Sequence, residues 1–225
     1  TVGDCLLLAA DGFRLAPNHS ATKVANILGE VDPGRSKGLL SGTIDTWLAW
    51  SLSGGSAFVT DASNASVTGL ATNGVDAWDG AVLRALNIPP ESLAAIGDSL
   101  GRLGTMDRLP GAPPLLAVLG DQQASMIGQG AVVPDAAKIT FGTGGMLDVC
   151  TPGDRPAVPR TAAGCFPIAG WSCDDRRTWA LEAIMLSAGT NVEWLRDDLG
   201  IIEDTADSHA LASSVDDADG VVFVP

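Results

Sequence analysis

Leu115-Leu-Ala-Val-Leu-Gly-Asp-Gln-Gln123 joins a continuous apolar run to a polar turn that begins with a carboxylate. Five consecutive apolar residues that end at a glycine are typical of a buried strand, and the stretch from Gln122 to Gln129 is typical of a helix. In open α/β sheets, ligands bind beyond the carboxyl ends of the strands. The sequence therefore predicts an α/β protein with Asp121 at a ligand-binding edge.

Two interpretations of Asp121 are open on spacing alone. The free N–H groups at the start of a helix favour an ionised carboxylate, and a carboxylate held there can take a proton from a substrate hydroxyl. Asp is also among the residues preferred as helix caps, so an ordinary cap explains the same position.

A second candidate is the glycine-rich turn Gly142-Thr143-Gly144-Gly145, which lies between Lys138–Phe141 and Met146–Cys150. The flanking segments predict two strands of a hairpin. Glycines allow successive N–H groups to face one concavity, and the hydroxyl of Thr143 adds a donor, so the turn is suited to phosphate oxygens. A tight hairpin without a ligand is the alternative. The turn has neither the Rossmann nor the P-loop spacing.

The rest of the chain alternates helices and strands. Polar residues near the second helix and the strand after it are explained by capping and turns: Asp45, Asp61, Ser63 and Asn64. We expect a helix that Ser20 caps and Gly29 ends, and further helices at Thr43–Leu52, Asp76–Leu86 and Pro90–Ile96 and along Ala188, Val192, Leu195 and Leu199. Strands are expected at Phe58–Thr60 and Trp179–Leu181. Residues 97–114 are expected to form a connection with one short strand.

Composition narrows the class of protein. The 225 residues are 46% hydrophobic and 18% charged, so a sizeable core is expected. A net charge of -14 with scattered basic residues argues against nucleic acid and anionic membranes as partners. The acidic segment from Asp197 to Asp219 is expected to be a solvated surface. The apolar runs are shorter than a spanning helix requires, which predicts a soluble protein.

The four cysteines and two histidines show no metal-ligand spacing. We therefore expect no metal site built from them, and reduced thiols typical of a cytoplasmic protein.

Several motifs, in this order, resemble those of the FGGY family of carbohydrate kinases, and of its glycerol kinase branch in particular. They are Ser20-Ala-Thr-Lys23, Gly42-Thr-Ile-Asp-Thr-Trp-Leu-Ala-Trp50, Thr60-Asp-Ala-Ser-Asn-Ala-Ser66, Gly120-Asp-Gln-Gln-Ala124, Lys138-Ile-Thr-Phe-Gly-Thr-Gly144 and Asn191-Val-Glu-Trp-Leu-Arg-Asp-Asp-Leu199. The resemblance covers most of the chain.

The resemblance implies an α/β protein with the actin-like ATPase (ribonuclease H-like) fold, in which two domains surround a cleft that closes on ATP and a polyol. It places residues 1–130 in the later part of the first domain and 131–225 at the beginning of the second, with the break between 129 and 134. The chain is then the middle of an enzyme, and is expected to be inactive alone.

By the same resemblance, Asp121 is the general base and Gln122 lies beside the substrate. Gly142, Thr143 and Gly144 form a phosphate-binding loop. Asn18 and Met146 line the polyol pocket at positions where glycerol kinases carry Tyr and Phe, so the shape and polarity of the pocket differ.

The implied reaction transfers phosphate from ATP, with Mg2+, to a terminal hydroxyl of a polyol, with glycerol as the leading candidate. Another polyol or sugar, or a non-catalytic binding module, is the alternative. The implied partners are the small-molecule polyol and ATP, and a homo-oligomer is left open.

Overall fold

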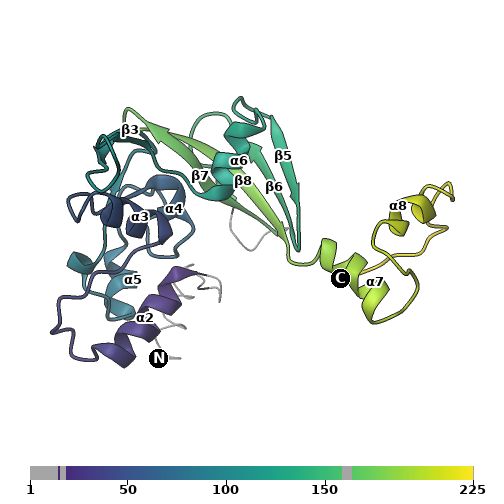
Figure 1. The fold of residues 1–225 in the computed structure, drawn as a ribbon, viewed down its shortest axis with the longest axis horizontal. Helices are drawn as coiled ribbons and strands as arrows, with labels where there is room; N and C mark the ends of the chain where they lie inside the picture. The colour runs from purple at the N-terminus through teal and green to yellow at the C-terminus, as the bar shows by residue number, and fades with distance from the viewer. Residues whose placement is uncertain (1–14, 16–18, 159–163, 225) are drawn as a thin grey trace.

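A computed structural model of the chain describes residue 15 and residues 19–158 and 164–224 (Figure 1). Asn18, one of the expected pocket residues, lies outside the described residues. The elements up to residue 117 are α2 (Ser20–Val31), α3 (Ile44–Leu52), β1 (Val59–Asp61), α4 (Ala62–Ser66), α5 (Gly80–Ala85), the 3-10 turn η1 (Pro90–Ser92), β2 (Ala95–Gly97), β3 (Leu100–Thr105) and β4 (Pro114–Ala117). They are followed by α6 (Asp121–Gly128), β5 (Ala137–Phe141), β6 (Gly145–Cys150), β7 (Cys165–Cys173), β8 (Arg176–Met185), α7 (Gly189–Asp197) and α8 (Asp207–Ala212).

The first part of the chain is a helical layer with a small parallel sheet. Strand β1 pairs with β2 in parallel, with Val59 opposite Ala95. Helices α2 and α5 share an apolar core made of Ala21, Leu28, Leu70, Val82, Leu83 and Ile88. Helix α4 packs its buried alanines Ala62 and Ala65 against Ala169 and Trp179 of the larger sheet. The helical layer and that sheet are therefore joined by a continuous apolar contact.

The larger sheet is antiparallel, with strand order β5-β6-β8-β7, and α6 lies across one of its faces (Figure 1). Met126 of α6 is fully buried against the sheet residues Cys150, Phe166, Ile168 and Ala180. This packing fixes α6, and with it the position of Asp121, over the sheet.

The apolar run at Leu115–Leu119 forms a strand only as far as Ala117, and the prediction that this strand is buried was wrong. Strand β4 pairs with β3 in a two-stranded antiparallel sheet, and the side chain of Leu116 is 58% exposed. A two-stranded hairpin covers each strand on one edge only, so an apolar run there is not enclosed as it is in a parallel sheet.

Several helix boundaries differ from the prediction, among them the end of α7 (Gly189–Asp197), which lies before Leu199. Helix α5 begins at Gly80 and not at Asp76, because Asp79 accepts hydrogen bonds from the N–H groups of Ala81 and Val82. Helix α2 has His19 and not Ser20 at its cap position, with no side-chain cap hydrogen bond, and it continues past Gly29 to Val31. After Pro90 the chain makes one 3-10 turn and then enters β2, whose pairing with β1 outweighs the helical spacing.

Helix α3 was predicted correctly at Thr43–Leu52, with Thr43 as its cap residue. Its apolar stripe, however, faces outward: Ile44 is 73% and Trp47 60% exposed, whereas Thr46 and Ala49 are buried. Helical spacing thus identified the helix, but the side that it buries carries Thr46 and Ala49.

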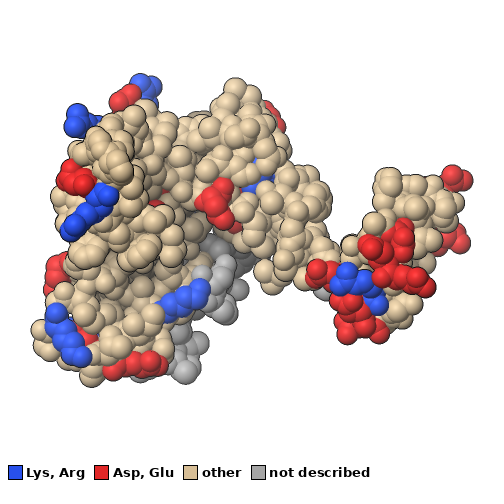
Figure 2. Space-filling model, viewed as in Figure 1, with Lys and Arg blue, Asp and Glu red and all other residues tan. Residues whose placement is uncertain are grey.

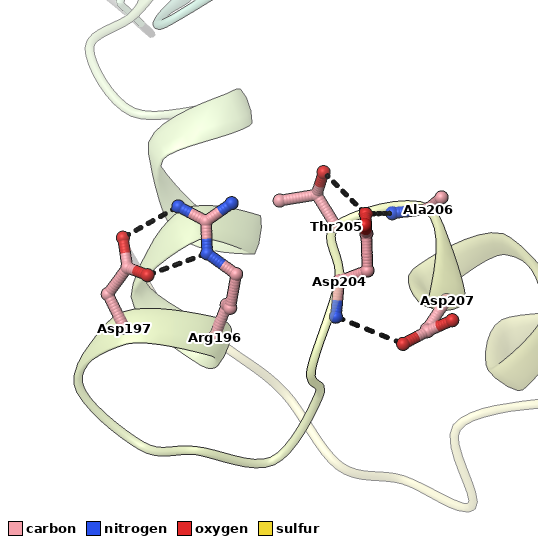
Figure 3. Close-up of polar contacts among 6 residues, drawn as sticks. All are labelled: Arg196, Asp197, Asp204, Thr205, Ala206 and Asp207. Carbon is pink, nitrogen blue, oxygen red and sulfur yellow. Dashed lines mark hydrogen bonds and ion pairs between the residues drawn. The ribbon is translucent and has the colours of Figure 1, made fainter.

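The acidic C-terminal segment is exposed, as expected, and contains the short helix α8, which the sequence did not predict. In Figure 2 red side chains gather over this end of the molecule. Figure 3 shows Arg196 donating from Nε and Nη2 to the two carboxylate oxygens of Asp197, a contact that raises the pKa of Arg196 and lowers that of Asp197. Asp204 accepts from the N–H of Ala206, and its own N–H donates to Asp207.

Within the described part of the chain, no helix is long and apolar enough to cross a membrane.

Candidate active site

Asp121 is the first residue of α6, and Gly120 occupies the cap position before it. The Asp121 side chain is exposed, and its Oδ1 accepts a hydrogen bond from the N–H of Gln122 at 2.8 Å. A Cβ atom at Gly120 would lie 2.2 Å from Oε1 of the buried Gln123, so a larger residue would have to displace that side chain. The carboxylate is therefore open to solvent at the start of a helix.

A buried polar network holds Gly120. The N–H of Gly120 donates to Ser63 Oγ at 2.9 Å, and this hydroxyl donates to Asp61 Oδ1, also at 2.9 Å. Asp61 is fully buried and accepts further hydrogen bonds from Asn64 and from the Ser99 hydroxyl. Asp61 does cap α4, as the sequence indicated, but the same carboxylate also supports the segment that carries Asp121.

The side chain of Gln122 is held from the sheet by Lys138. Lys138 Nζ lies 2.5 Å from Gln122 Oε1, 2.9 Å from Thr140 Oγ1 and 2.7 Å from Asp148 Oδ2. The side chains of Lys138 and Asp148 are 1% and 0% exposed. The buried ammonium therefore donates to Gln122 and Thr140 and forms an ion pair with Asp148, while within the described residues the Asp148 carboxylate oxygens accept no hydrogen bond.

Met146 lies in the same neighbourhood. It is half-buried on β6 and is the register partner of Thr140, which Lys138 contacts. Helix α6 and the hairpin thus bring Gln122, Thr140 and Met146 together. Asn18 cannot be added, because it lies outside the described residues.

The glycine-rich turn is a hairpin, as predicted: Phe141 pairs with Gly145, and the N–H of Gly142 donates to the carbonyl of Gly144 at 2.8 Å. The start of α7 buttresses it, since the N–H groups of Ala188 and Gly189 donate to Thr143 and Gly142 carbonyls. A Cβ atom at Gly144 would lie 2.7 Å from the carbonyl oxygen of Met185, so only glycine fits.

The donors of this turn fit a phosphate group in part. The N–H of Gly142 donates within the turn, so it is not available to a phosphate oxygen. Among the described residues, nothing accepts from the N–H groups of Thr143 and Gly144, and Thr143 is exposed. Two backbone donors and a hydroxyl are the kind of set that binds phosphate oxygens.

No group of three His, Cys, Asp or Glu residues that could hold a metal ion occurs in the part of the chain that the structure describes. Cys150, Cys165 and Cys173 are free thiols. Burial, and then the charge of Asp135, raises the pKa of the Cys150 thiol, which keeps it protonated beneath α6.

Comparison with known proteins defines the class to which this fold and site belong. The family model described as the N-terminal domain of the FGGY family of carbohydrate kinases matches residues 7–128. The chain belongs to this family, and its resemblance to the family and the actin-like fold expected from it are confirmed.

The particular relatives that the chain matches are glycerol kinases. It is 44% identical over 216 residues to a glycerol kinase of Gloeobacter violaceus, covering 95% of this chain and 43% of the relative. It is 42% identical over 221 residues to a glycerol kinase of Halorhodospira halophila, again covering 95% of this chain and 43% of the relative. The chain therefore spans less than half the length of the curated relatives it matches.

Solved structures agree. The glycerol kinase of Plasmodium falciparum, solved with ADP, superposes with a TM-score of 0.79 at 27% identity, covering 91% of this chain and 42% of that one. A xylulose kinase of Rhodospirillum rubrum, at 18% identity and a TM-score of 0.72, covering 95% of this chain and 46% of that one, shares the fold.

Proposed function

We propose that this chain contributes the active site of a kinase. The kinase transfers the γ-phosphoryl group of ATP to a terminal hydroxyl of a polyol, with glycerol as the first candidate. The observation that carries this proposal is the exposed carboxylate of Asp121, fixed at the start of α6 beside Gln122. The glycerol kinase relatives support the choice of substrate, and the ADP-bound structural neighbour supports the nucleotide.

In the proposed reaction Asp121 accepts the proton of the attacking hydroxyl as its oxygen bonds to the γ-phosphorus, while the bond to the bridging oxygen of ADP breaks. The N–H groups of Thr143 and Gly144 and the Thr143 hydroxyl are assigned to phosphate oxygens. Mg2+ would enter with ATP and neutralise phosphate charge; among the described residues we assign no ligand to it. The domain division at 130/131 belongs to the same proposal.

The test is ATP turnover by the full-length gene product with and without glycerol, comparing the wild type with Asp121→Asn. Loss of a general base lowers kcat by about 10²- to 10⁴-fold. Asp216→Asn, which removes an exposed carboxylate in the acidic segment, is the matched control and should leave turnover unchanged. Glycerol-dependent turnover that survives in Asp121→Asn would contradict the assigned base.

A kinase for another polyol or sugar is favoured by one observation, the half-buried Met146 at a position where the resemblance implies Phe. A panel of polyols and sugars, measured for wild type and Met146→Phe, distinguishes the two substrates. Phosphorylation of another compound in preference to glycerol, with a shift toward glycerol in Met146→Phe, would select the alternative.

The non-catalytic alternative predicts binding without turnover. Calorimetric titration with glycerol and ATP, made on the preparation used for the assay, would identify it by heat of binding with no ADP formed.

A further inference from the structure

We infer that Lys138 is a positioning residue that fixes the amide of Gln122, so that Gln122 presents its NH2 group, and not its oxygen, to the substrate. The inference rests on the proposed function, because it assigns Gln122 a place beside the polyol. It adds a specificity-determining residue on the sheet to a site otherwise formed by α6 and the glycine-rich turn.

The first step is the orientation of the amide. An amide side chain carries an acceptor oxygen at one end and a donor nitrogen at the other, and its environment decides which end faces which way. Lys138 Nζ, a donor without acceptor capacity, lies 2.5 Å from Gln122 Oε1. With the oxygen turned toward the ammonium, Nε2 is directed away from it. Within the described residues, Nε2 makes no other hydrogen bond, so it is available to donate to a hydroxyl oxygen.

The second step is what holds the lysine. Register pairs Lys138 on β5 with Asp148 on β6, and the two charged groups are 2.7 Å apart with their side chains 1% and 0% exposed. A lysine side chain is usually long, mobile and solvated. Here the ion pair and the hydroxyl of Thr140 confine the ammonium to one place, so it can act as a fixed reference for Gln122.

The third step is the consequence for the site. Thr140 is two residues before the glycine-rich turn and is the register partner of Met146. The ammonium therefore ties the helix that carries Asp121 to the hairpin that carries the turn. Loss of Lys138 should free the Gln122 amide to rotate, which weakens polyol binding more than it slows the chemical step.

The test replaces the whole buried pair, because Lys138→Met alone would leave Asp148 as a buried unpaired carboxylate. Lys138→Met combined with Asp148→Leu removes both charges and fills the space of the two buried side chains with apolar ones. Lys37→Met, which removes an exposed lysine, is the matched control. In the full-length gene product the double variant should raise the KM for the polyol about three- to tenfold, the loss expected for one neutral hydrogen bond, with the KM for ATP unchanged.

A readout without turnover accompanies the kinetics. Gln122, Gln123 and Gln129 are the glutamines of this chain, so labelling glutamine with 15N gives few side-chain amide signals from it. Gln122→Leu assigns the Gln122 pair of signals, and Gln129, whose amide donates to Ser125 Oγ at 2.8 Å, serves as an internal reference. The Gln122 pair should shift in the double variant, while the Gln129 pair stays in place.

The outcomes separate the inference from the function it rests on. An unchanged Gln122 amide signal in the double variant overturns the inference whatever the turnover. A shifted signal with an unchanged polyol KM also overturns it, and so does a full further rise in KM when the pair is replaced in a Gln122→Leu background. If the wild type phosphorylates no polyol, the proposed function fails and the substrate role of Gln122 with it, and the amide signal still decides whether Lys138 orients the side chain.

Discussion

Single residues in this chain carry two structural tasks at once, and Ser63 is the clearest example. Its hydroxyl accepts from the N–H of Gly120 and donates to the buried carboxylate of Asp61. The sequence indicated only a turn or cap residue here, since Ser near an Asp favours both. The long-range partner Gly120 is 57 residues away, and local patterns contain no information about it.

Ser63→Ala should therefore lower the free energy of unfolding by about 1–3 kcal/mol, because the partly buried N–H of Gly120 loses its acceptor and the buried Asp61 loses a donor. Urea unfolding followed by circular dichroism measures this change. Ser66→Ala, which removes a hydroxyl that donates to the Ser63 carbonyl, should cost less, because a carbonyl left alone is more easily satisfied. Equal losses in the two variants would show that Gly120 does not depend on Ser63.

Lys138 shows what residue-level reasoning could have found. A lone lysine in an alternating strand suggests a solvated side chain, yet the turn fixes the register. With Phe141 opposite Gly145, Lys138 falls opposite Asp148, so the sequence holds an opposite-charge pair across the hairpin. The pair is buried because α6 packs over the sheet. The sequence of the hairpin alone contains no sign of that helix.

At the scale of elements, the start of the helix predicted at Asp76–Leu86 was wrong because two candidate caps competed. Asp76 and Asp79 both precede an apolar stretch. Asp79 forms the cap, while Asp76 accepts from the Thr72 hydroxyl at 2.5 Å, and this bond is the main reason that the pKa of Asp76 lies below its ordinary value.

Asp79→Ala should destabilise the protein by about 0.5–2 kcal/mol, because α5 places the buried Val82 and Leu83 in the core and its first N–H groups would lose their acceptor. Thermal or urea unfolding measures the loss. Asp79→Ser keeps a capping oxygen and should retain most of the stability. If Asp79→Ser were as unstable as Asp79→Ala, capping of α5 would not explain the contribution of the Asp79 carboxylate to stability.

Strand β7 was not predicted, and its sequence explains why. Pro167 and Gly170 interrupt the apolar run from Cys165 to Cys173, and both residues are typical of strand ends. In the sheet, Pro167 sits on an outermost strand, and the register shifts between Ala169 and Trp171, next to Gly170. Pro167 is tolerated because β7 is an edge strand, and Gly170 is tolerated because the strand is irregular there.

At the scale of the whole molecule, two properties oppose each other in the isolated chain. A net charge of -14 keeps copies apart, whereas large apolar side chains such as Ile44, Trp47 and Phe141 are exposed and favour association. Composition gave the charge correctly but not the exposure, because an apolar stripe is normally assigned to a core.

The 225-residue chain should therefore self-associate more strongly as salt is added, since screening shortens the reach of the repulsion to about 8 Å at 0.15 M ionic strength. Sedimentation velocity at low and high salt measures this effect. Replacing Ile44 and Trp47 with Glu should reduce association at every salt concentration. A monomer whose sedimentation is independent of salt would contradict the expectation.

The outward position of the α3 indole rings also affects the intrinsic tryptophan fluorescence of the protein. Trp47 is 60% and Trp50 44% exposed, so both rings stay partly in contact with water in the folded chain. Trp179, 7% exposed, and the half-buried Trp78 and Trp171 change their surroundings far more. The shift in intrinsic fluorescence on unfolding should therefore come mainly from β7, β8 and the segment before α5, with a smaller contribution from α3.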